Sequence, residues 1–175
     1  KVGYVGNITH RLDFKLLFEL IPKNPNVSFI FTDAPLSMPS EDAYRNTVNN
    51  INQLHQFPNV YFIPKALYRT SIKEIIKHLN IGMIPYDISL VFNRNSYPMK
   101  LFEYFYLNKP VISTPILELM QFPRHVLIGR NASEWKSNIY RLLSNSLMEI
   151  NCETQFVLAK TNSWDLKVQK ILNLI

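Results

Sequence analysis

Short apolar runs alternate with segments of helical periodicity along the whole chain, and this alternation most constrains the fold. The runs are rich in Val, Ile and Phe, and they are Val2–Gly6, Val27–Thr32, Val60–Ile63, Ile81–Ile84, Pro110–Ser113 and Val126–Ile128. Continuous apolar runs are typical of strands covered on both faces of a sheet. Strands separated by helices imply right-handed crossovers. The sequence therefore predicts an α/β, Rossmann-like three-layer domain with a mostly parallel sheet of about six strands.

The segments between these runs carry helix signals. Asp13 and Ser40 are capping residues that precede apolar positions at helical spacing, and Asn131 with Glu134 has the spacing of a capping box. Further helices are predicted over about Ser71–Leu79, Met99–Leu107, Ile116–Met120 and Trp135–Leu143, with a helical tail from about residue 149 that breaks near Asn162. Pro85–Tyr97 is predicted to be a loop, long for a strand-to-helix connection.

Composition narrows the class further. The chain has 175 residues, 47% of them hydrophobic, which excludes a disordered chain. No apolar run reaches the roughly 18 residues of a membrane span, and the single cysteine, Cys152, excludes a disulfide framework. Without a repeat or linker, we expect one domain over residues 1–175, and because the sequence begins at Lys1 we expect a fragment of a longer protein.

The chain is basic, with 19 Lys and Arg against 13 Asp and Glu. The net charge of +6 suits an anionic ligand, a nucleic acid or an acidic membrane surface. Because the basic residues are spread along the chain, nucleic-acid binding is disfavoured. We expect a cytoplasmic protein, and the charge permits peripheral association with the inner face of the membrane.

The first predicted strand ends where a ligand would bind, because ligands of parallel sheets lie outside the carboxyl ends of the strands. Gly6 permits close approach of a ligand, and Arg11 stands just before a predicted helix, a place that favours anions. The alternative is a surface arginine paired with Asp13. No G-x-G-x-x-G and no Walker loop is present, which disfavours dinucleotide and P-loop sites.

A second candidate site begins at Pro98, which favours the first position of a helix. Lys100 then falls in the first turn, where a cation opposes the helix dipole unless an anion binds beside it. Glu103 lies one turn deeper on the same face and could accept two hydrogen bonds from a ribose diol. The alternative is a surface Lys–Glu pair at i,i+3 spacing.

Two segments here resemble a known family. Residues 98–105 (PMKLFEYF) and 108–114 (NKPVIST) are similar to the P-x-K-[LF]-x-E-Y-[LF]-x-x-G-K-P-V-[VI]-[SA]-T motif of group-1 glycosyltransferases. Matching segments occur in the same order through Ser163-Trp164-Asp165, so the resemblance covers nearly the whole chain. It implies the carboxy-terminal, donor-binding half of a GT-B glycosyltransferase, with the amino-terminal acceptor domain missing.

The resemblance assigns roles residue by residue. It implies that Lys100 and Arg11 contact the donor diphosphate and stabilise the charge of the leaving group, and that Glu103 binds the ribose. Many members carry a glutamate near the transferred sugar where this chain has Asn95. Two family glycines are replaced by Asn108 and Asp33. These departures put the sugar contact and a retaining reaction in question.

The resemblance also implies where the rest of the donor lies. The base is expected near the end of the third strand, around Lys65 and Tyr68, although a loop tyrosine that shields the core explains Tyr68 equally well. The Pro85–Tyr97 loop holds side chains able to bind sugar hydroxyls, namely Asn93, Arg94, Asn95 and Ser96.

The sequence therefore favours a glycosyltransferase donor domain that binds a uridine or guanosine diphosphate sugar, in cell-surface polysaccharide or glycoconjugate synthesis. The resemblance implies that no metal and no other cofactor is needed, and the scattered histidines offer no metal-ligand spacing. We expect little transfer from this fragment alone. The alternatives are a non-catalytic nucleotide-sugar binding module and a sugar-nucleotide epimerase of the same architecture.

Overall fold

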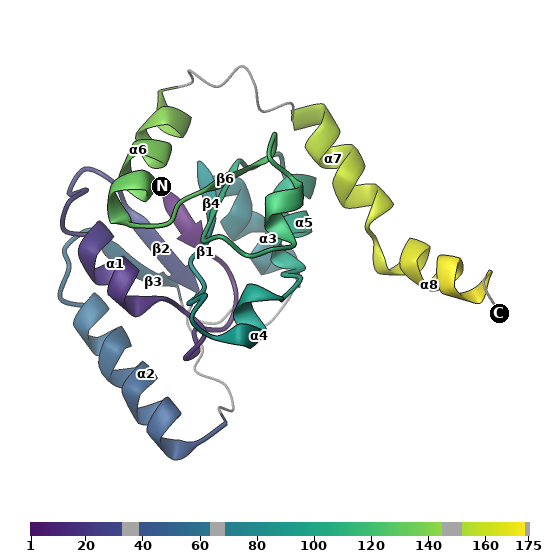
Figure 1. The fold of residues 1–175 in the computed structure, drawn as a ribbon. Helices are drawn as coiled ribbons and strands as arrows, with labels where there is room; N and C mark the ends of the chain where they lie inside the picture. Colours follow the sequence, from purple (N-terminus) through teal and green to yellow (C-terminus); the bar gives the residue numbers. More distant parts are fainter. Residues whose placement is uncertain (33–38, 64–68, 145–151, 174–175) are drawn as a thin grey trace.

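The computed structural model describes residues 1–32, 39–63, 69–144 and 152–173. Six parallel strands form one sheet in the order β3-β2-β1-β4-β5-β6 (Figure 1). The strands are β1 (Val2–Tyr4), β2 (Phe29–Thr32), β3 (Val60–Ile63), β4 (Ile81–Ile84), β5 (Val111–Ser113) and β6 (Val126–Ile128). Each one lies within a predicted apolar run, so the predicted Rossmann-like α/β fold is confirmed.

Helices cover both faces of this sheet. They are α1 (Phe14–Leu20), α2 (Glu41–Leu54), α3 (Arg69–His78), α4 (Val91–Arg94), α5 (Lys100–Tyr106), α6 (Ala132–Leu143), α7 (Cys152–Thr161) and α8 (Trp164–Leu172), with a 3₁₀ turn η1 (Leu119–Gln121). α1 packs beside α6, and α5 packs against α7 (Figure 1). The predicted tail is helical and breaks at Asn162-Ser163 as expected.

The central strands and the helices that pack on them form the core. All residues of β1, β4 and β5 are buried, whereas the edge strand β3 leaves Tyr61 half exposed. Helix α5 approaches the sheet at Gly82, where a Cβ would lie only 2.6 Å from the ring of Tyr104. The hydroxyl of Tyr104 donates to the carbonyl of Gly3 at 3.1 Å and accepts from the amide of Val5 at 3.0 Å. This tyrosine therefore fixes α5, with Lys100 and Glu103, against the end of β1.

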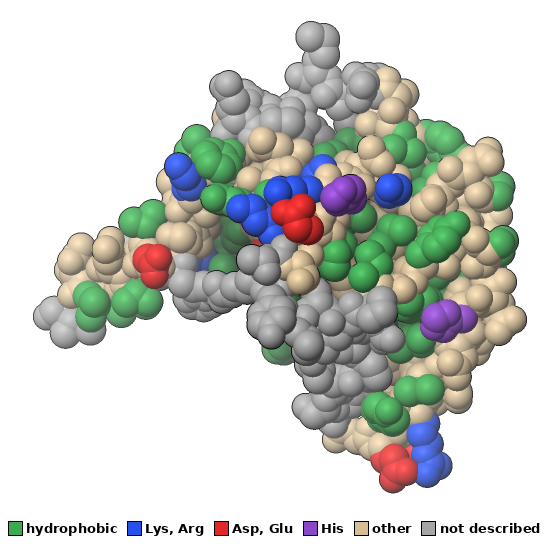
Figure 2. Space-filling view, turned by 180° about the vertical axis from the view of Figure 1, so that it is seen from behind, with side chains coloured by type: hydrophobic (Ala, Val, Ile, Leu, Met, Phe, Trp, Pro, Cys, Tyr) green, Lys and Arg blue, Asp and Glu red, His purple; other side chains and the backbone are tan. Residues whose placement is uncertain are grey.

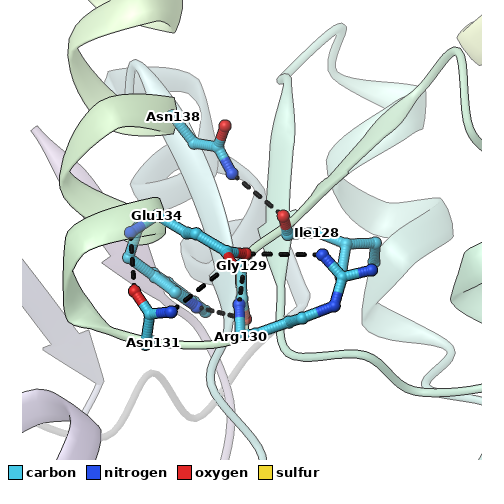
Figure 3. Close-up of polar contacts among 7 residues, drawn as sticks. Ile128, Gly129, Arg130, Asn131, Glu134 and Asn138 are labelled. Carbon is cyan, nitrogen blue, oxygen red and sulfur yellow. Dashed lines mark hydrogen bonds and ion pairs between the residues drawn. The ribbon is translucent and has the colours of Figure 1, made fainter.

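The predicted cap at the start of α6 is formed by Asn131, and the Glu134 carboxylate returns to the residue before the cap (Figure 3). Asn131 Oδ1 accepts from the backbone amide of Glu134 at 2.9 Å. The Glu134 carboxylate reaches back to the amide of Arg130 at 2.9 Å, one residue before the cap, and lies 3.5 Å from the Arg130 guanidinium. Asn138 donates to the carbonyl of Ile128 at 3.1 Å and so ties the same helix to β6.

The end of α5 explains why an asparagine replaces the family glycine. Asn108 has a φ of 53°, in the left-handed region that only glycine adopts freely. Its amide donates to the carbonyl of Phe105, and the amide of Lys109 donates to the carbonyl of Tyr104. Asparagine is the other residue commonly found at this position of a helix end. The substitution is therefore compatible with the fold. Asp33, at the other replaced glycine, lies outside the described residues.

Two features differ from the sequence expectations. The Pro85–Tyr97 segment contains a short helix, α4, and the predicted helix over Ile116–Met120 is a 3₁₀ turn displaced toward Gln121. Helix α8 projects from the body of the domain and leaves several apolar side chains exposed, among them Val168, Ile171 and Leu172 (Figure 1). Among the described residues, no helix combines the length and apolar character needed to cross a membrane.

Candidate functional site

A cleft of about 760 Å³ opens at the carboxyl ends of β1 and β4. These two strands are neighbours in the sheet, but the chain leaves them in opposite directions, toward β2 and toward β5. Such a point of reversal is where ligands bind in open α/β sheets. The cleft is lined by residues after β1, residues after β4 and the first turn of α5, including Gly6, Arg11, Tyr86, Asn95, Lys100 and Glu103.

Gly6 lines the cleft next to Lys100. Its φ of 141° is one that side chains rarely adopt, and a Cβ at this position would lie 2.8 Å from the Nζ of Lys100. The hydroxyl of Thr32, at the end of β2, accepts from the amide of Gly6 at 2.8 Å and donates to its carbonyl at 3.1 Å. The glycine therefore leaves room for the lysine head group, as well as for a ligand.

Lys100 enters the cleft from the first turn of α5. Its Nζ lies 3.7 Å from the ring centroid of Tyr4 and 5.2 Å from that of Tyr86. Among the described residues, no carboxylate lies within 4.0 Å of this ammonium group. Burial lowers the pKa of Lys100 well below its ordinary value, Glu103 opposes that effect, and Arg11 adds to it. Without a ligand, the charged form of Lys100 is thus poorly compensated, and an anion in the cleft would stabilise it.

Arg11 lies near Lys100 in the cleft, because both groups approach the ring of Tyr86. Its guanidinium carbon lies 4.4 Å from the ring centroid of Tyr86 and 4.7 Å from that of Phe92, so the group sits between two rings. Its Nε donates to Asn93 Oδ1 at 2.7 Å. The expected alternative, an ion pair with Asp13, is not formed, because the Asp13 carboxylate instead caps α1 by accepting from the amide of Leu16 at 2.9 Å.

Glu103 lies one turn after Lys100 on the rim of the cleft. Its side chain is exposed, and it is close enough to Lys100 to raise the pKa of that lysine. The cleft therefore brings together Lys100, Arg11 and Glu103, which the family resemblance assigned to one donor site. The space-filling view of the face opposite that of Figure 1 shows several Lys and Arg side chains gathered beside an acidic one (Figure 2).

The polar residues of the Pro85–Tyr97 segment divide into two groups. Asn95 is exposed at the end of α4 and lines the cleft, although its amide also donates to the carbonyl of Val91 at 2.9 Å. Asn93 was counted among the side chains able to bind sugar hydroxyls, but the structure does not leave it available for that role. Its side chain is fully buried and makes three hydrogen bonds inside the protein. Arg94 donates to the carbonyl of Ile88 and is not among the cleft residues, whereas Ser96 is.

Sequence reasoning missed the aromatic side chains that surround the two cations, namely Tyr4, Tyr86 and Phe92. Tyr86 lies two residues after the end of β4, which could have identified it, whereas Tyr4 has the pattern of an ordinary strand residue. Lys65 and Tyr68, expected near the base, lie outside the described residues. In the described part of the chain, no group of three His, Cys, Asp or Glu side chains is placed to hold a metal ion.

The cleft also touches the helical tail. The hydroxyl of Tyr97, a cleft residue, donates to Asn162 Oδ1 at 3.1 Å, between α7 and α8. The Nζ of Lys167 in α8 lies 4.4 Å from the Tyr97 ring centroid. The start of α8 is thus attached to the cleft rim even though the rest of the helix projects away from it.

Known structures share this architecture. Anabaena Alr3699/HepE in complex with UDP superposes with a TM-score of 0.71 at 14% identity, covering 99% of this chain and 48% of that one. The trehalose-6-phosphate synthase OtsA gives a TM-score of 0.71 at 15% identity, covering 99% of this chain and 43% of that one. The fold is that of one half of a GT-B glycosyltransferase.

A relative found by sequence similarity supports the likeness to glycosyltransferases. TuaH of Bacillus subtilis (strain 168) is named as a candidate glycosyltransferase of teichuronic acid biosynthesis, and it is 26% identical over 175 residues, which cover 98% of this chain and 42% of TuaH. The resemblance to group-1 glycosyltransferases inferred from the Lys100 segment is thereby confirmed. No family model matches the chain. The chain spans less than half the length of each of these relatives.

Proposed function

We propose that this chain is the donor-binding half of a glycosyltransferase and that its cleft binds the diphosphate of a nucleotide-activated sugar. The observation that carries the proposal is the convergence of Lys100 and Arg11 on a cleft at the point where strand order reverses. Neither cation has a carboxylate within 4.0 Å among the described residues. A diphosphate would supply the missing negative charge, and the two cations would stabilise the charge that grows on it as it leaves.

The nucleoside would extend from the diphosphate toward Glu103. A carboxylate on the cleft rim, one helical turn from the lysine, is placed to accept hydrogen bonds from a ribose diol. HepE has been crystallised with UDP and with UDP-glucose, which favours uridine as the nucleoside here. The transferred sugar would then lie toward Asn95, on the α4 side of the cleft.

The acceptor would bind to a part of the enzyme beyond this chain. The chain covers 42–48% of TuaH and HepE, so a second half of similar size is expected to close over the cleft. The exposed apolar side chains of α8 are a candidate surface for contact with that half. TuaH is named for teichuronic acid biosynthesis, and a cell-surface polysaccharide or glycoconjugate is accordingly the acceptor class that we propose. Diphosphate binding by side chains requires no metal, so we propose a metal-independent and cofactor-independent reaction.

Calorimetric titration with UDP tests the proposal. The 175-residue chain should bind UDP, and Lys100→Ala should weaken binding by about 10- to 150-fold, the range for a hydrogen bond between charged groups. Lys23→Ala is the matched control, because Lys23 is exposed and is not a cleft residue, and it removes the same charge. If the wild-type chain binds no nucleoside diphosphate, or if both variants lose affinity equally, the proposed function is wrong.

A further inference from the structure

The side chain of Asn93, next to the cleft, makes three hydrogen bonds inside the protein. It is fully buried, although it lies in the short helix α4 at the protein surface. Its Nδ2 donates to the carbonyl of Arg11 at 2.9 Å and to the carbonyl of Asp87 at 2.8 Å. Its Oδ1 accepts from the Nε of Arg11 at 2.7 Å. One amide therefore holds both the main chain and the side chain of Arg11.

The position of Arg11 is fixed by other contacts as well. The amide of Asp87 donates to the Arg11 carbonyl at 2.8 Å, and Leu12 forms an antiparallel bridge with Tyr86. The rings of Tyr86 and Phe92 lie on the guanidinium at 4.4 and 4.7 Å. The hydrogen bond from Arg11 Nε to Asn93 Oδ1 fixes the orientation of the guanidinium plane, because the guanidinium is planar and rigid. Arg11 lines the cleft, and within the described part of the chain its two terminal nitrogens have no hydrogen-bond partner.

We infer that Asn93 is a positioning residue, which orients Arg11 so that its terminal nitrogens face an anion in the cleft. This inference rests on the proposed function, because that anion is the donor diphosphate. An arginine loses much rotamer freedom when it is immobilised. In this protein Arg11 loses that freedom when the chain folds. The entropic cost of immobilising Arg11 therefore does not reduce the affinity for the anion.

The chemistry of the position favours asparagine over other side chains of its size. The site requires one acceptor for the Arg11 Nε and two donors for the carbonyls of Arg11 and Asp87. An amide has both, whereas aspartate offers acceptors alone and leucine offers neither. Aspartate would also place a negative charge against the guanidinium and cancel the charge that the anion needs.

A merely structural role for Asn93, which would shape the loop without acting through Arg11, is the competing explanation. A double-mutant cycle on UDP affinity separates the two explanations. Asn93→Ala in the wild-type background should weaken UDP binding by about 3- to 10-fold, the effect of immobilising one long side chain on binding. In the Arg11→Met background the same substitution should have almost no further effect. An equal loss in both backgrounds would overturn the inference.

One further measurement covers the case in which Asn93→Ala does not fold. Nuclear magnetic resonance of the unmodified chain should show a slowly exchanging Arg11 Nε–H before UDP is added, in contrast to that of the exposed Arg45. An Arg11 signal that exchanges as fast as that of Arg45 until UDP is present would contradict positioning by Asn93.

These outcomes are distinct from a failure of the proposed function. If the wild-type chain does not bind UDP at all, the proposed function is wrong, and the inference about Asn93 falls with it. If the wild-type chain binds UDP and the cycle is additive, the proposed function stands and only the role of Asn93 is wrong.

Discussion

The two cations of the cleft are held by different means. Lys100, on α5, lies near the rings of Tyr4 and Tyr86, and burial lowers its pKa. Arg11, in the segment after β1, donates from its Nε to a buried amide and lies near the rings of Tyr86 and Phe92. Arginine stays charged at any ordinary pH, whereas a lysine responds to its surroundings. We conclude that Arg11 is positioned before an anion binds, whereas an anion bound beside Lys100 would raise the lowered pKa of that lysine.

The largest expected difference concerns the loss of each cation. Lys100→Met should reduce UDP affinity by about 10- to 150-fold. The same variant should raise the free energy of unfolding of the free protein by about 1 kcal/mol, or about 2–4 °C in melting temperature, because it replaces a half-buried ammonium group that has no carboxylate within 4.0 Å among the described residues. Calorimetry and thermal denaturation measure the two quantities.

Arg11→Met is the matched comparison. It should also weaken UDP binding, but it should lower the melting temperature of the free protein, because Asn93 then keeps a buried acceptor without its donor. If Lys100→Met destabilises the free protein as much as Arg11→Met does, the contrast between the two cations is wrong.

The second prediction concerns pH. Burial lowers the pKa of Lys100 in the free protein, and a bound diphosphate should raise it again. Binding then takes up a proton, so UDP affinity should fall by up to about tenfold per pH unit between these two pKa values. In the same range the unfolded chain binds more protons than the free folded protein, so the free protein should become more stable as pH rises.

Titrations in buffers of different ionisation enthalpy measure this proton uptake directly. The uptake should disappear in Lys100→Met and remain in Arg11→Met. An uptake that is unchanged in Lys100→Met would assign it to another group.

The third prediction concerns the rim. Glu103→Gln keeps the shape of the side chain and one acceptor, and it should weaken UDP binding by about 2- to 12-fold, the size of one net hydrogen bond. Inorganic pyrophosphate has no ribose, so its affinity should stay within about twofold of the wild-type value. Equal weakening of both ligands would show that Glu103 acts on Lys100 and not on a ribose.

The smallest expected effect is that of Asn95→Ala. UDP affinity should be nearly unchanged, while the preference for UDP-glucose over UDP should fall by about 2- to 5-fold, since one amide contact to a sugar hydroxyl is lost. Competition titrations measure this preference. A larger effect on UDP itself would place Asn95 against the diphosphate.

The fold was predictable from sequence because its strands are buried on both faces and read as unbroken apolar runs. The placement of Lys100 and Glu103 one turn apart in the first part of α5 was predictable because Pro98 indicates a helix start, and helix geometry sets the rest. Even the Asn108 substitution has a local reason in its left-handed φ.

The surroundings of Arg11 were not predictable in this way. They depend on the antiparallel bridge between Leu12 and Tyr86, which joins two segments far apart in the sequence. Asn93 reads as a surface loop residue, and only the contact between those segments makes it a buried partner of Arg11. The hydrophobic pattern of a single segment does not indicate a contact between two distant segments.

A crystal structure of the chain with UDP tests the central claim most directly. We predict that the diphosphate lies between the Nζ of Lys100 and the terminal nitrogens of Arg11, with the ribose hydroxyls toward Glu103 and the Arg11 guanidinium in its present position. A diphosphate bound elsewhere, or a Lys100 head group that remains between Tyr4 and Tyr86 without touching it, would contradict the account.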